Sequence, residues 1–284
     1  MTRLAVPKTY KLFIGGKFPR SESGRVYEIA TAKGAFLANA AKASRKDARD
    51  AVVAARAAQP GWAKATGYNR GQVLYRIAEL LEGRRVQFAA ELSLSEGLSK
   101  GAAEQQVDAA IDAWVWYAGW ADKYVQVAGN ANAVSGPYFN ISVPEPTGVV
   151  AIVAPQVQSL LGLVSVVAPA LVAGNTVVVL ASENAPLSAI SLSEVLATSD
   201  VPAGVVNLLT GSAAEVVPWL ASHADVNALD LAGAGELDWV DLEISAADTL
   251  KRVLRPEPGV PAPSLGRITA FTETKTVWHT KSMI

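Results

Sequence analysis

Side chains that could carry out covalent or metal chemistry are scarce in this sequence. Its 284 residues include no cysteine, so the chain itself offers no disulfide, no thiolate metal ligand and no thiol nucleophile. The two histidines, His223 and His279, are far apart in the sequence. A zinc site or a histidine acid–base pair needs such residues close together. These counts predict no metal site, no thiol nucleophile and no histidine acid–base pair.

The composition is typical of a compact globular protein. Half of the residues are hydrophobic, 18% are charged and the formal net charge is −1. This balance gives no reason to expect nucleic acid or an anionic membrane as a partner. The first residues, MTRLAVPKTYKLF, lack the apolar core of a secretory signal, and prolines and glycines interrupt the long apolar stretch 148–179. We therefore expect a cytoplasmic location.

The first 124 residues are predicted to be mainly helical. Two short paired strands are expected first, at 11–16 and 24–29. A helix capped by Ser44 should then stop at Pro60. Apolar stripes predict three further helices, at about 68–83, 86–95 and 102–124. The last of these carries an aromatic cluster for which core packing is favoured over a ligand cage. Its members are Trp114, Trp116, Tyr117 and Trp120.

Buried strands then alternate with helices. The expected strands are 149–153, 176–180, 205–209 and 228–231, separated by helices at 160–173, 186–198 and 213–222. Continuous apolar strands alternating with helices indicate a parallel sheet covered on both faces. We expect an α/β fold with a doubly wound, Rossmann-like parallel sheet, an N-terminal helical layer and a small β arm.

The C-terminal stretch changes character again. After a short acidic helix, prolines between 256 and 263 suggest a linker. Residues 268–279, ITAFTETKTVWH, alternate as a β-strand does. Because a single strand is not stable alone, this strand must pair with 138–143, with the sheet of another chain, or with both.

These segments, in this order, resemble the NAD(P)-dependent aldehyde dehydrogenase superfamily. The resemblance rests on seven short segments spread over most of the chain. They are 13–16 (FIGG), 118–123 (AGWADK), 145–150 (EPTGVV), 168–178 (APALVAGNTVV), 201–207 (VPAGVVN), Gly211 and 272–277 (TETKTV).

The same resemblance implies site residues that this chain replaces. Active relatives have a Trp-Asn pair where Gln156 and Val157 stand, and valine cannot donate the hydrogen bond that stabilises the oxyanion. The family's ribose-binding Lys and pyrophosphate-contacting Ser correspond to Leu180 and Ala234. Glu183 keeps the chemistry of the family's ribose-binding Glu and is the one candidate cofactor residue. The alternative interpretation of Glu183 is an acid favoured by the dipole of the helix that follows it in the sequence.

The family's catalytic domain also has no counterpart here. Only about thirty residues, 235–264, stand where the family has a domain with its general-base Glu and Cys nucleophile. Thiolate attack and base-assisted hydrolysis need groups that this chain lacks. We therefore expect the protein not to be an enzyme, but a pseudoenzyme with no cofactor.

The function expected from these features is that of a structural or regulatory subunit. The chain resembles the second, non-catalytic module of the sixteenth aldehyde dehydrogenase family. The implied partner is a full-length aldehyde dehydrogenase, or a second copy of this chain, joined by strand addition. The residues expected to assemble are Tyr138, Asn140, Thr272, Glu273, Thr274, Lys275, Thr276 and Val277.

The expected domain division follows the family pattern. Residues 1–136 and 147–250 would form a degenerate dinucleotide-binding domain, 137–146 and 267–284 the oligomerisation arm, and 251–266 a linker. Two alternatives stay open. One is a regulator that binds NAD(P) or another nucleotide in the crevice of the sheet. The other is a genuine NAD(P)-dependent aldehyde oxidoreductase.

Overall fold

A five-stranded parallel sheet forms the centre of the structure. The computed structural model describes residue 6 and residues 8–281. The strand order is β10-β9-β6-β7-β8, and every neighbouring pair is parallel. The strands are β6 (Val149–Val153), β7 (Thr176–Leu180), β8 (Val206–Leu209), β9 (Ala228–Asp230) and β10 (Arg252–Leu254). The expected doubly wound α/β fold is confirmed.

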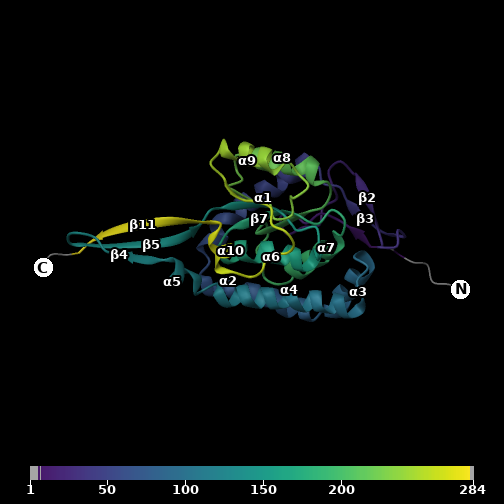
Figure 1. Ribbon diagram of the computed structural model, residues 1–284, viewed down its shortest axis with the longest axis horizontal. Helices are drawn as coiled ribbons and strands as arrows, with labels where there is room; N and C mark the ends of the chain where they lie inside the picture. Colours follow the sequence, from purple (N-terminus) through teal and green to yellow (C-terminus); the bar gives the residue numbers. More distant parts are fainter. Residues whose placement is uncertain (1–5, 7, 282–284) are drawn as a thin grey trace.

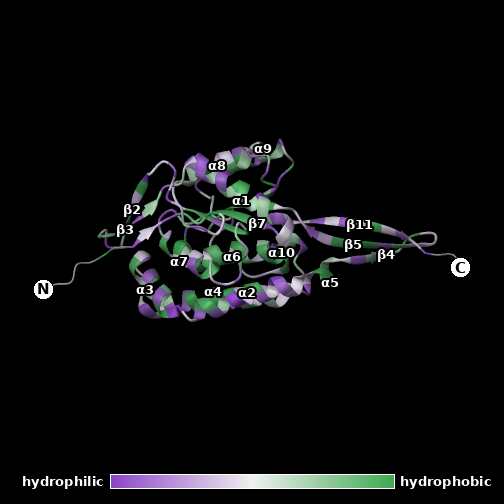
Figure 2. Cartoon of the chain, turned by 180° about the vertical axis from the view of Figure 1, so that it is seen from behind, coloured by the Kyte–Doolittle hydropathy of each residue, from purple (hydrophilic) through white to green (hydrophobic). Residues whose placement is uncertain are grey.

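Helices cover both faces of this sheet (Figure 1). In β6, Val149 and Ala151 join one buried cluster, while Val150 and Ile152 join another. The first cluster includes residues of α1 (Arg45–Lys64), α8 (Ala213–Ser222) and α9 (Trp239–Ala247), and the second residues of α6 (Ser159–Val172) and α7 (Leu187–Leu196). Burial on both faces explains the continuous apolar strands, which Figure 2 shows in the hydrophobic colour at β7.

An outer layer of helices lies over α6. It consists of α2 (Gly67–Glu82), α3 (Arg85–Ser95) and α4 (Lys100–Trp120) (Figure 1). Trp114 and Tyr117 of α4 are fully buried in the cluster that α4 shares with α6. Trp116 packs against Tyr117 and Trp120, with ring centroids 4.9 and 5.8 Å apart. The predicted core role of this aromatic cluster is confirmed.

Among the helices of the described residues, none combines the length and the apolar character that crossing a bilayer requires.

Helix α1 continues past the proline at which the sequence predicted its end. Ser44 caps the helix as expected, accepting hydrogen bonds from the N–H groups of Lys46 and Asp47. Pro60, however, lies inside the helix, which runs on to Lys64. The buried Trp62 donates its indole N–H to the carbonyl of Leu171 at 3.1 Å. This contact with α6 supports the last turn, so tertiary packing outweighs the hydrogen bond that proline removes.

A small three-stranded sheet near the N-terminus differs from the expected pair of strands. It contains β1 (Thr9–Tyr10), β2 (Val26–Ala30) and β3 (Phe36–Ala41), in the order β1-β3-β2. The strand expected at 11–16 is reduced to an isolated antiparallel bridge between Phe13 and Leu208, and β1 ends at Tyr10. The chain then turns at Gly15 and Gly16, which have positive φ, as the two glycines in the sequence indicate. The alanine-rich strand β3 carries little β-propensity and gave no signal in the sequence.

The remaining strands form an arm that extends away from the body (Figure 1). After the short helix α5 (Tyr124–Ala128) come β4 (Asn130–Asn132) and β5 (Tyr138–Pro146), and β11 (Thr272–Thr280) completes an antiparallel sheet in the order β11-β5-β4. The C-terminal strand therefore pairs with the segment that contains 138–143, which is one of the arrangements expected from the sequence. Residues 282–284 of the expected arm lie outside the described residues.

The passage expected to be a linker is partly ordered as secondary structure. Within it, β10 pairs with β9 and adds an edge strand to the central sheet. Helix α10 (Leu265–Thr269) then occupies the start of the stretch that was expected to be a strand. The Ser264 hydroxyl accepts a hydrogen bond from the Arg267 N–H at 3.2 Å and caps this turn. As a result, the arm strand begins at Thr272.

Candidate functional site

The loops that follow four parallel strands meet around one cavity. Its volume is about 440 Å³. Gln156 follows β6, Glu183 follows β7, Ser212 follows β8 and Gly233 follows β9. The remaining lining residues are Asn184, Ala213, Ala214, Glu236 and Leu237. The carboxyl edge of an open parallel sheet is where such folds bind their ligands, so this cavity is the candidate site.

The side chain of Gln156 ties two of these strand ends together. Its amide nitrogen donates to the Ala154 carbonyl at 2.9 Å, and its amide oxygen accepts from the Glu183 N–H at 2.9 Å. The sequence marked Gln156 only as a lost tryptophan. In the structure, this residue fixes the backbone from which the Glu183 carboxylate projects.

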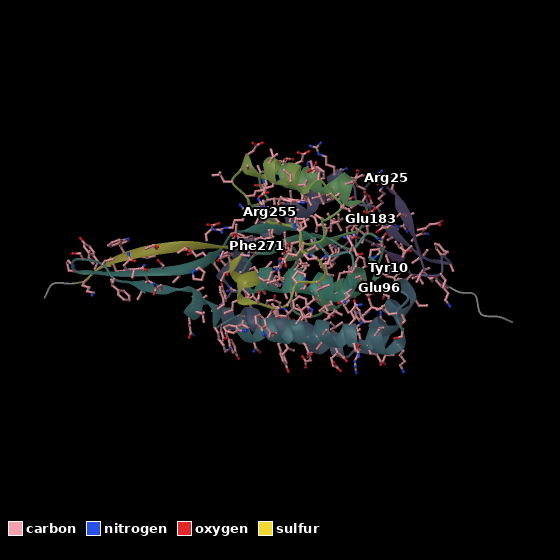
Figure 3. All side chains as sticks on the ribbon, in the orientation of Figure 1. Tyr10, Arg25, Glu96, Glu183, Arg255 and Phe271 are labelled. Carbon is pink, nitrogen blue, oxygen red and sulfur yellow. The ribbon has the colours of Figure 1, made fainter. Side chains whose placement is uncertain are left out.

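Glu183 is half-buried at the wall of the cavity, in the body of the molecule away from the arm (Figure 3). One carboxylate oxygen, Oε2, accepts from the Ala213 N–H in the first turn of α8, at 3.2 Å. Within residues 8–281, no hydrogen bond engages the other oxygen, Oε1. Glu183 therefore bonds to the N-terminus of α8 and not to that of α7, the next helix in the sequence, which was the alternative interpretation. It also keeps one acceptor for a ligand hydroxyl.

Gly233 lies where no side chain fits. A Cβ atom on this residue would stand 1.9 Å from the carbonyl oxygen of Ala154. The Gly233 N–H donates to the Val153 carbonyl at 2.9 Å, which holds the turn against the end of β6. The turn therefore presents bare backbone to the cavity, as close approach of a ligand requires.

The lining fits the nucleoside end of a dinucleotide better than its phosphate end. The free oxygen of Glu183 and the amide of Asn184 suit ribose hydroxyls, and the backbone at Gly233 leaves room for a ligand. Glu183 and Glu236 give the cavity acidic character, and its nine lining residues include no lysine or arginine. A ribose-bearing ligand thus has partners here, while its phosphates must rely on backbone donors.

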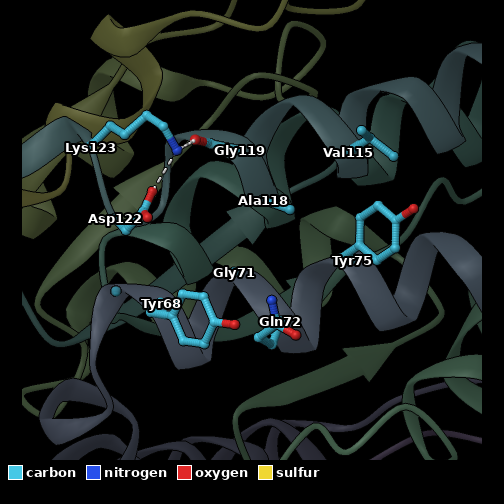
Figure 4. Close-up of a pocket in the computed structure, with 10 residues that line it drawn as sticks. Tyr68, Gly71, Gln72, Tyr75, Val115, Ala118, Gly119, Asp122 and Lys123 are labelled. Carbon is cyan, nitrogen blue, oxygen red and sulfur yellow. Dashed lines mark hydrogen bonds and ion pairs between the residues drawn. The ribbon is translucent and has the colours of Figure 1, made fainter.

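A second hollow lies on the outer helical layer, between α2 and α4 (Figure 4). It measures about 310 Å³, and small residues such as Gly71 and Ala118 form its floor between Tyr68 and Tyr75. Lys123 pairs with Asp122 at 2.7 Å at one end. This hollow is remote from the strand ends, and its charged groups already satisfy each other, so it is a weaker candidate than the cavity at the sheet edge.

Apart from Glu183, three positions at which the resemblance implied catalytic or cofactor groups carry none. Val157 is 56% exposed and Gln158 has a φ of 49°, so the loop after β6 points a methyl group to solvent. Leu180 is the buried last residue of β7, and Ala234 is buried beneath the Gly233 turn. None of these three positions offers a polar side chain to the cavity.

All eight residues expected to assemble lie on the arm. Tyr138 and Asn140 are on β5, and the other six are on β11. Two bonds fix the ladder: the Thr147 N–H donates to Phe271 O at 3.1 Å and the Lys281 N–H to Pro137 O at 2.7 Å. Because hydrogen-bonded pairs alternate in antiparallel sheets, odd-numbered residues of β11 face β5. The even-numbered ones, from Thr272 to Thr280, therefore turn their N–H and C=O groups to the free edge.

One pair of functional candidates escaped the sequence analysis. Asp230, the last residue of β9, is 0% exposed and forms an ion pair with Arg267 of α10, which is 7% exposed. Burial raises the pKa of the Asp230 carboxyl, and the Arg267 charge opposes that rise. The signal was a carboxylate within the apolar run Ala228–Leu231, because a buried charge demands a partner.

The comparisons with known proteins agree with this fold. The aldehyde dehydrogenase family model matches residues 18–254, so the chain belongs to the aldehyde dehydrogenase family. It is 33% identical over 261 residues to mouse cytosolic 10-formyltetrahydrofolate dehydrogenase, covering 88% of this chain and 28% of that protein. It is 34% identical over 251 residues to chicken retinal dehydrogenase 2, covering 87% of this chain and 48% of that one.

Solved structures show the same likeness. Betaine aldehyde dehydrogenase from Staphylococcus aureus, in complex with NAD+, superposes with a TM-score of 0.79 and 25% identity over 86% of this chain and 48% of that chain. An aldehyde dehydrogenase from Bacillus cereus superposes with a TM-score of 0.79 and 28% identity, over 87% of this chain and 50% of that chain. The chain thus spans about half the length of most of these relatives, and less of the formyltetrahydrofolate enzyme.

Two expectations from the sequence are wrong in the light of these relatives. The expectation of a pseudoenzyme is contradicted, because the relatives that the chain matches over most of its length are dehydrogenases. The expectation of no cofactor is contradicted as well, because matching structures were crystallised with NAD+. The absence of cysteine, of a counterpart to the catalytic domain and of several site residues in this sequence was too weak a basis for both expectations.

Proposed function

We propose that this chain supplies the NAD(P)-binding and assembly parts of an aldehyde-oxidising enzyme of its family. The observation that carries the proposal is the cavity where four strand-end loops converge around Glu183 and the bare backbone of Gly233. Position at the carboxyl edge of a doubly wound sheet supports a nucleotide as the ligand. The NAD+ complexes of similar structures support the same choice.

Three residues of the cavity have distinct tasks in this proposal. Glu183 accepts hydrogen bonds from ribose hydroxyls, Gln156 holds the Glu183 backbone in place, and Gly233 lets the ligand approach the main chain. A bound nicotinamide dinucleotide supplies a hydride acceptor to the reaction. Burial of the strand ends keeps water away from the inner wall of the site.

Assembly is the second part of the proposal. The 284 residues contain no cysteine, so a thiol nucleophile would have to come from outside these residues. The free edge of β11 offers five residues with outward backbone groups, which supports strand addition by a partner. One face of the arm also carries apolar side chains, including Phe139, Ile141 and Val277, and Phe139 is 47% exposed. The partner is a full-length aldehyde dehydrogenase or a second copy of this chain. The cytoplasmic location stays a prediction.

Calorimetric titration of the purified chain with NAD+ and with NADP+ tests the nucleotide site. Saturable binding of either dinucleotide that weakens in Glu183→Gln supports the proposal. Glu104→Gln, a change on α4 at a carboxylate that does not line the cavity, is the control and should bind as the unchanged protein does. Absence of saturable binding up to millimolar concentrations would overturn the nucleotide site.

Assembly needs a separate measurement. Native mass spectrometry of the chain alone, and mixed with a full-length family member from the same cells, should show a complex of fixed stoichiometry. Aldehyde-dependent NAD(P)H formation by that complex, above the rate of the partner alone, would support a role in oxidation. A complex that binds dinucleotide but leaves the rate unchanged would favour the nucleotide-binding regulator instead.

A further inference from the structure

A buried ion pair connects the base of the arm to the turn that lines the nucleotide cavity. We infer that Asp230 and Arg267 are positioning residues through which the α10–β11 segment holds the Gly233 turn, so that arm pairing and nucleotide binding influence each other. This inference rests on the proposed function for its nucleotide half. The arrangement of the two residues stands on the geometry alone.

The first step is the double engagement of the Asp230 carboxylate. Oδ2 pairs with the Arg267 guanidinium, and Oδ1 accepts from the Ala232 N–H at 3.1 Å. Ala232 directly precedes Gly233, whose N–H is bonded to β6 and whose backbone lines the cavity. A single carboxylate therefore fixes the backbone of the cavity turn and also holds a residue 37 positions further along the chain.

The second step is the anchoring of Arg267. Its side chain also pairs with Glu257 at 3.2 Å, and its backbone N–H is capped by Ser264. Without Arg267, the fully buried Asp230 would lose its cationic partner, and a buried charge left without one is strongly unfavourable. The carboxylate would then have to take up a proton or move, and either change loosens its hold on the Ala232 N–H.

The third step leads from α10 to the arm. Phe271 is fully buried between α10 and β11, and its carbonyl accepts from the Asn175 side chain at 2.9 Å and from the Thr147 N–H at 3.1 Å. β11 begins at the next residue. Any displacement of the arm base by a partner is therefore transmitted to α10 and, through Arg267, to the cavity turn. By thermodynamic linkage, a ligand that orders the Gly233 turn must in return favour the position of the arm base in which that turn is held.

Full-length variants separate a positioning role from general stabilisation. Arg267→Met removes the ion pair, Arg267→Lys keeps the charge, and Arg255→Met removes an exposed pair with Glu243 in the same segment as a control. We expect Arg267→Met to weaken NAD+ binding about tenfold and to speed amide hydrogen exchange at 231–235. Arg267→Lys should restore part of both, and Arg255→Met should change neither. Unchanged exchange at 231–235 in folded Arg267→Met would overturn the inference.

Two further measurements keep the inference testable if Arg267→Met does not fold. Asp230→Asn keeps the size of the side chain and an acceptor for the Ala232 N–H, and should speed exchange at 265–271. In the unchanged protein, saturating NAD+ should slow exchange at 265–271 as well as at 231–235, and protection confined to 231–235 would contradict the coupling. If the unchanged protein does not bind NAD+, the proposed function fails. Amide hydrogen exchange of the variants, measured without nucleotide, then still tests whether α10 holds the Gly233 turn.

Discussion

The amide oxygen of Gln156 accepts a hydrogen bond from the backbone N–H of Glu183 at 2.9 Å. This bond joins the loops after β6 and β7, between which the chain runs through α6 and β7. It explains how Glu183 can be held at the cavity although its neighbours in the sequence differ from those of active relatives. A ligand would depend on where the Glu183 carboxylate lies, and Gln156 sets that position.

Replacing Gln156 with Ala should therefore weaken nucleotide binding more than it destabilises the fold. Loss of the two hydrogen bonds is expected to lower the free energy of unfolding by about 1–2 kcal/mol. Dinucleotide affinity should fall several-fold because the Glu183 loop becomes mobile. Urea unfolding and calorimetric titration measure the two effects, with Gln105→Ala, an exposed change on α4, as the control. Equal affinities in both variants would show that Gln156 is only structural.

Glu183 should make the site prefer NAD+ over NADP+. A 2′-phosphate placed near this carboxylate and near Glu236 would be repelled, and the lining has no cation to offset the charge. Glu183→Gln is expected to narrow the preference by about tenfold, equivalent to ~1.4 kcal/mol. Parallel titrations with both dinucleotides measure the ratio. A ratio that does not change with this substitution would place the ribose away from Glu183.

Gly233→Ala should be the most damaging small substitution at the cavity. Its Cβ would collide with the Ala154 carbonyl at 1.9 Å, so the turn or the end of β6 must shift. Overpacking of this kind costs about 1–3 kcal/mol, and dinucleotide binding should be lost with it. Gly235→Ala, two residues further on, has nothing within 4 Å of its added Cβ and serves as the matched control. In thermal unfolding, Gly233→Ala should have a clearly lower midpoint temperature than Gly235→Ala.

Thr274→Pro should impair assembly without unfolding the arm. Thr274 faces the free edge of β11, so proline removes an outward N–H and leaves the hydrogen bonds to β5 in place. Lys275→Pro, one residue further along, removes a donor to β5 and should loosen the arm itself. Native mass spectrometry reports assembly, and hydrogen exchange at 138–146 reports the arm. Assembly that persists unchanged in Thr274→Pro would exclude strand addition at this edge.

The pH dependence of stability should reveal Glu91. Burial raises the pKa of this carboxyl, which accepts a hydrogen bond from the Ser191 hydroxyl at 2.7 Å. A raised folded pKa means that the contribution of Glu91 to stability is fully present below the unfolded pKa and is lost as the pH rises through the folded value. Glu91→Gln should therefore unfold at higher urea concentration than the unchanged protein at pH 8, with a smaller difference at pH 5. An equal difference at both pH values would contradict the assigned shift.

The sequence by itself determined four of the five strands of the central sheet, and the family. Residues 149–153 and 176–180 are continuous apolar runs of strand length between turn residues, and the structure has strands with the same bounds. Helix α8 at 213–222 also matches its predicted range. These elements could be predicted because burial on both faces leaves a local pattern that needs no knowledge of the partner. The short sequence segments that resemble the family likewise led to the membership that the family model shows.

Only the tertiary structure decided which polar groups meet. Gln156 and Glu183, or Asp230 and Arg267, are separated by 27 and 37 residues, and no local periodicity connects them. The same holds for α1, whose last turn past Pro60 depends on Trp62 reaching Leu171, and for β10, whose three residues become a strand by pairing with β9. A hydrogen bond or an ion pair gains its strength from burial and geometry, and both are set by the packing of the whole chain.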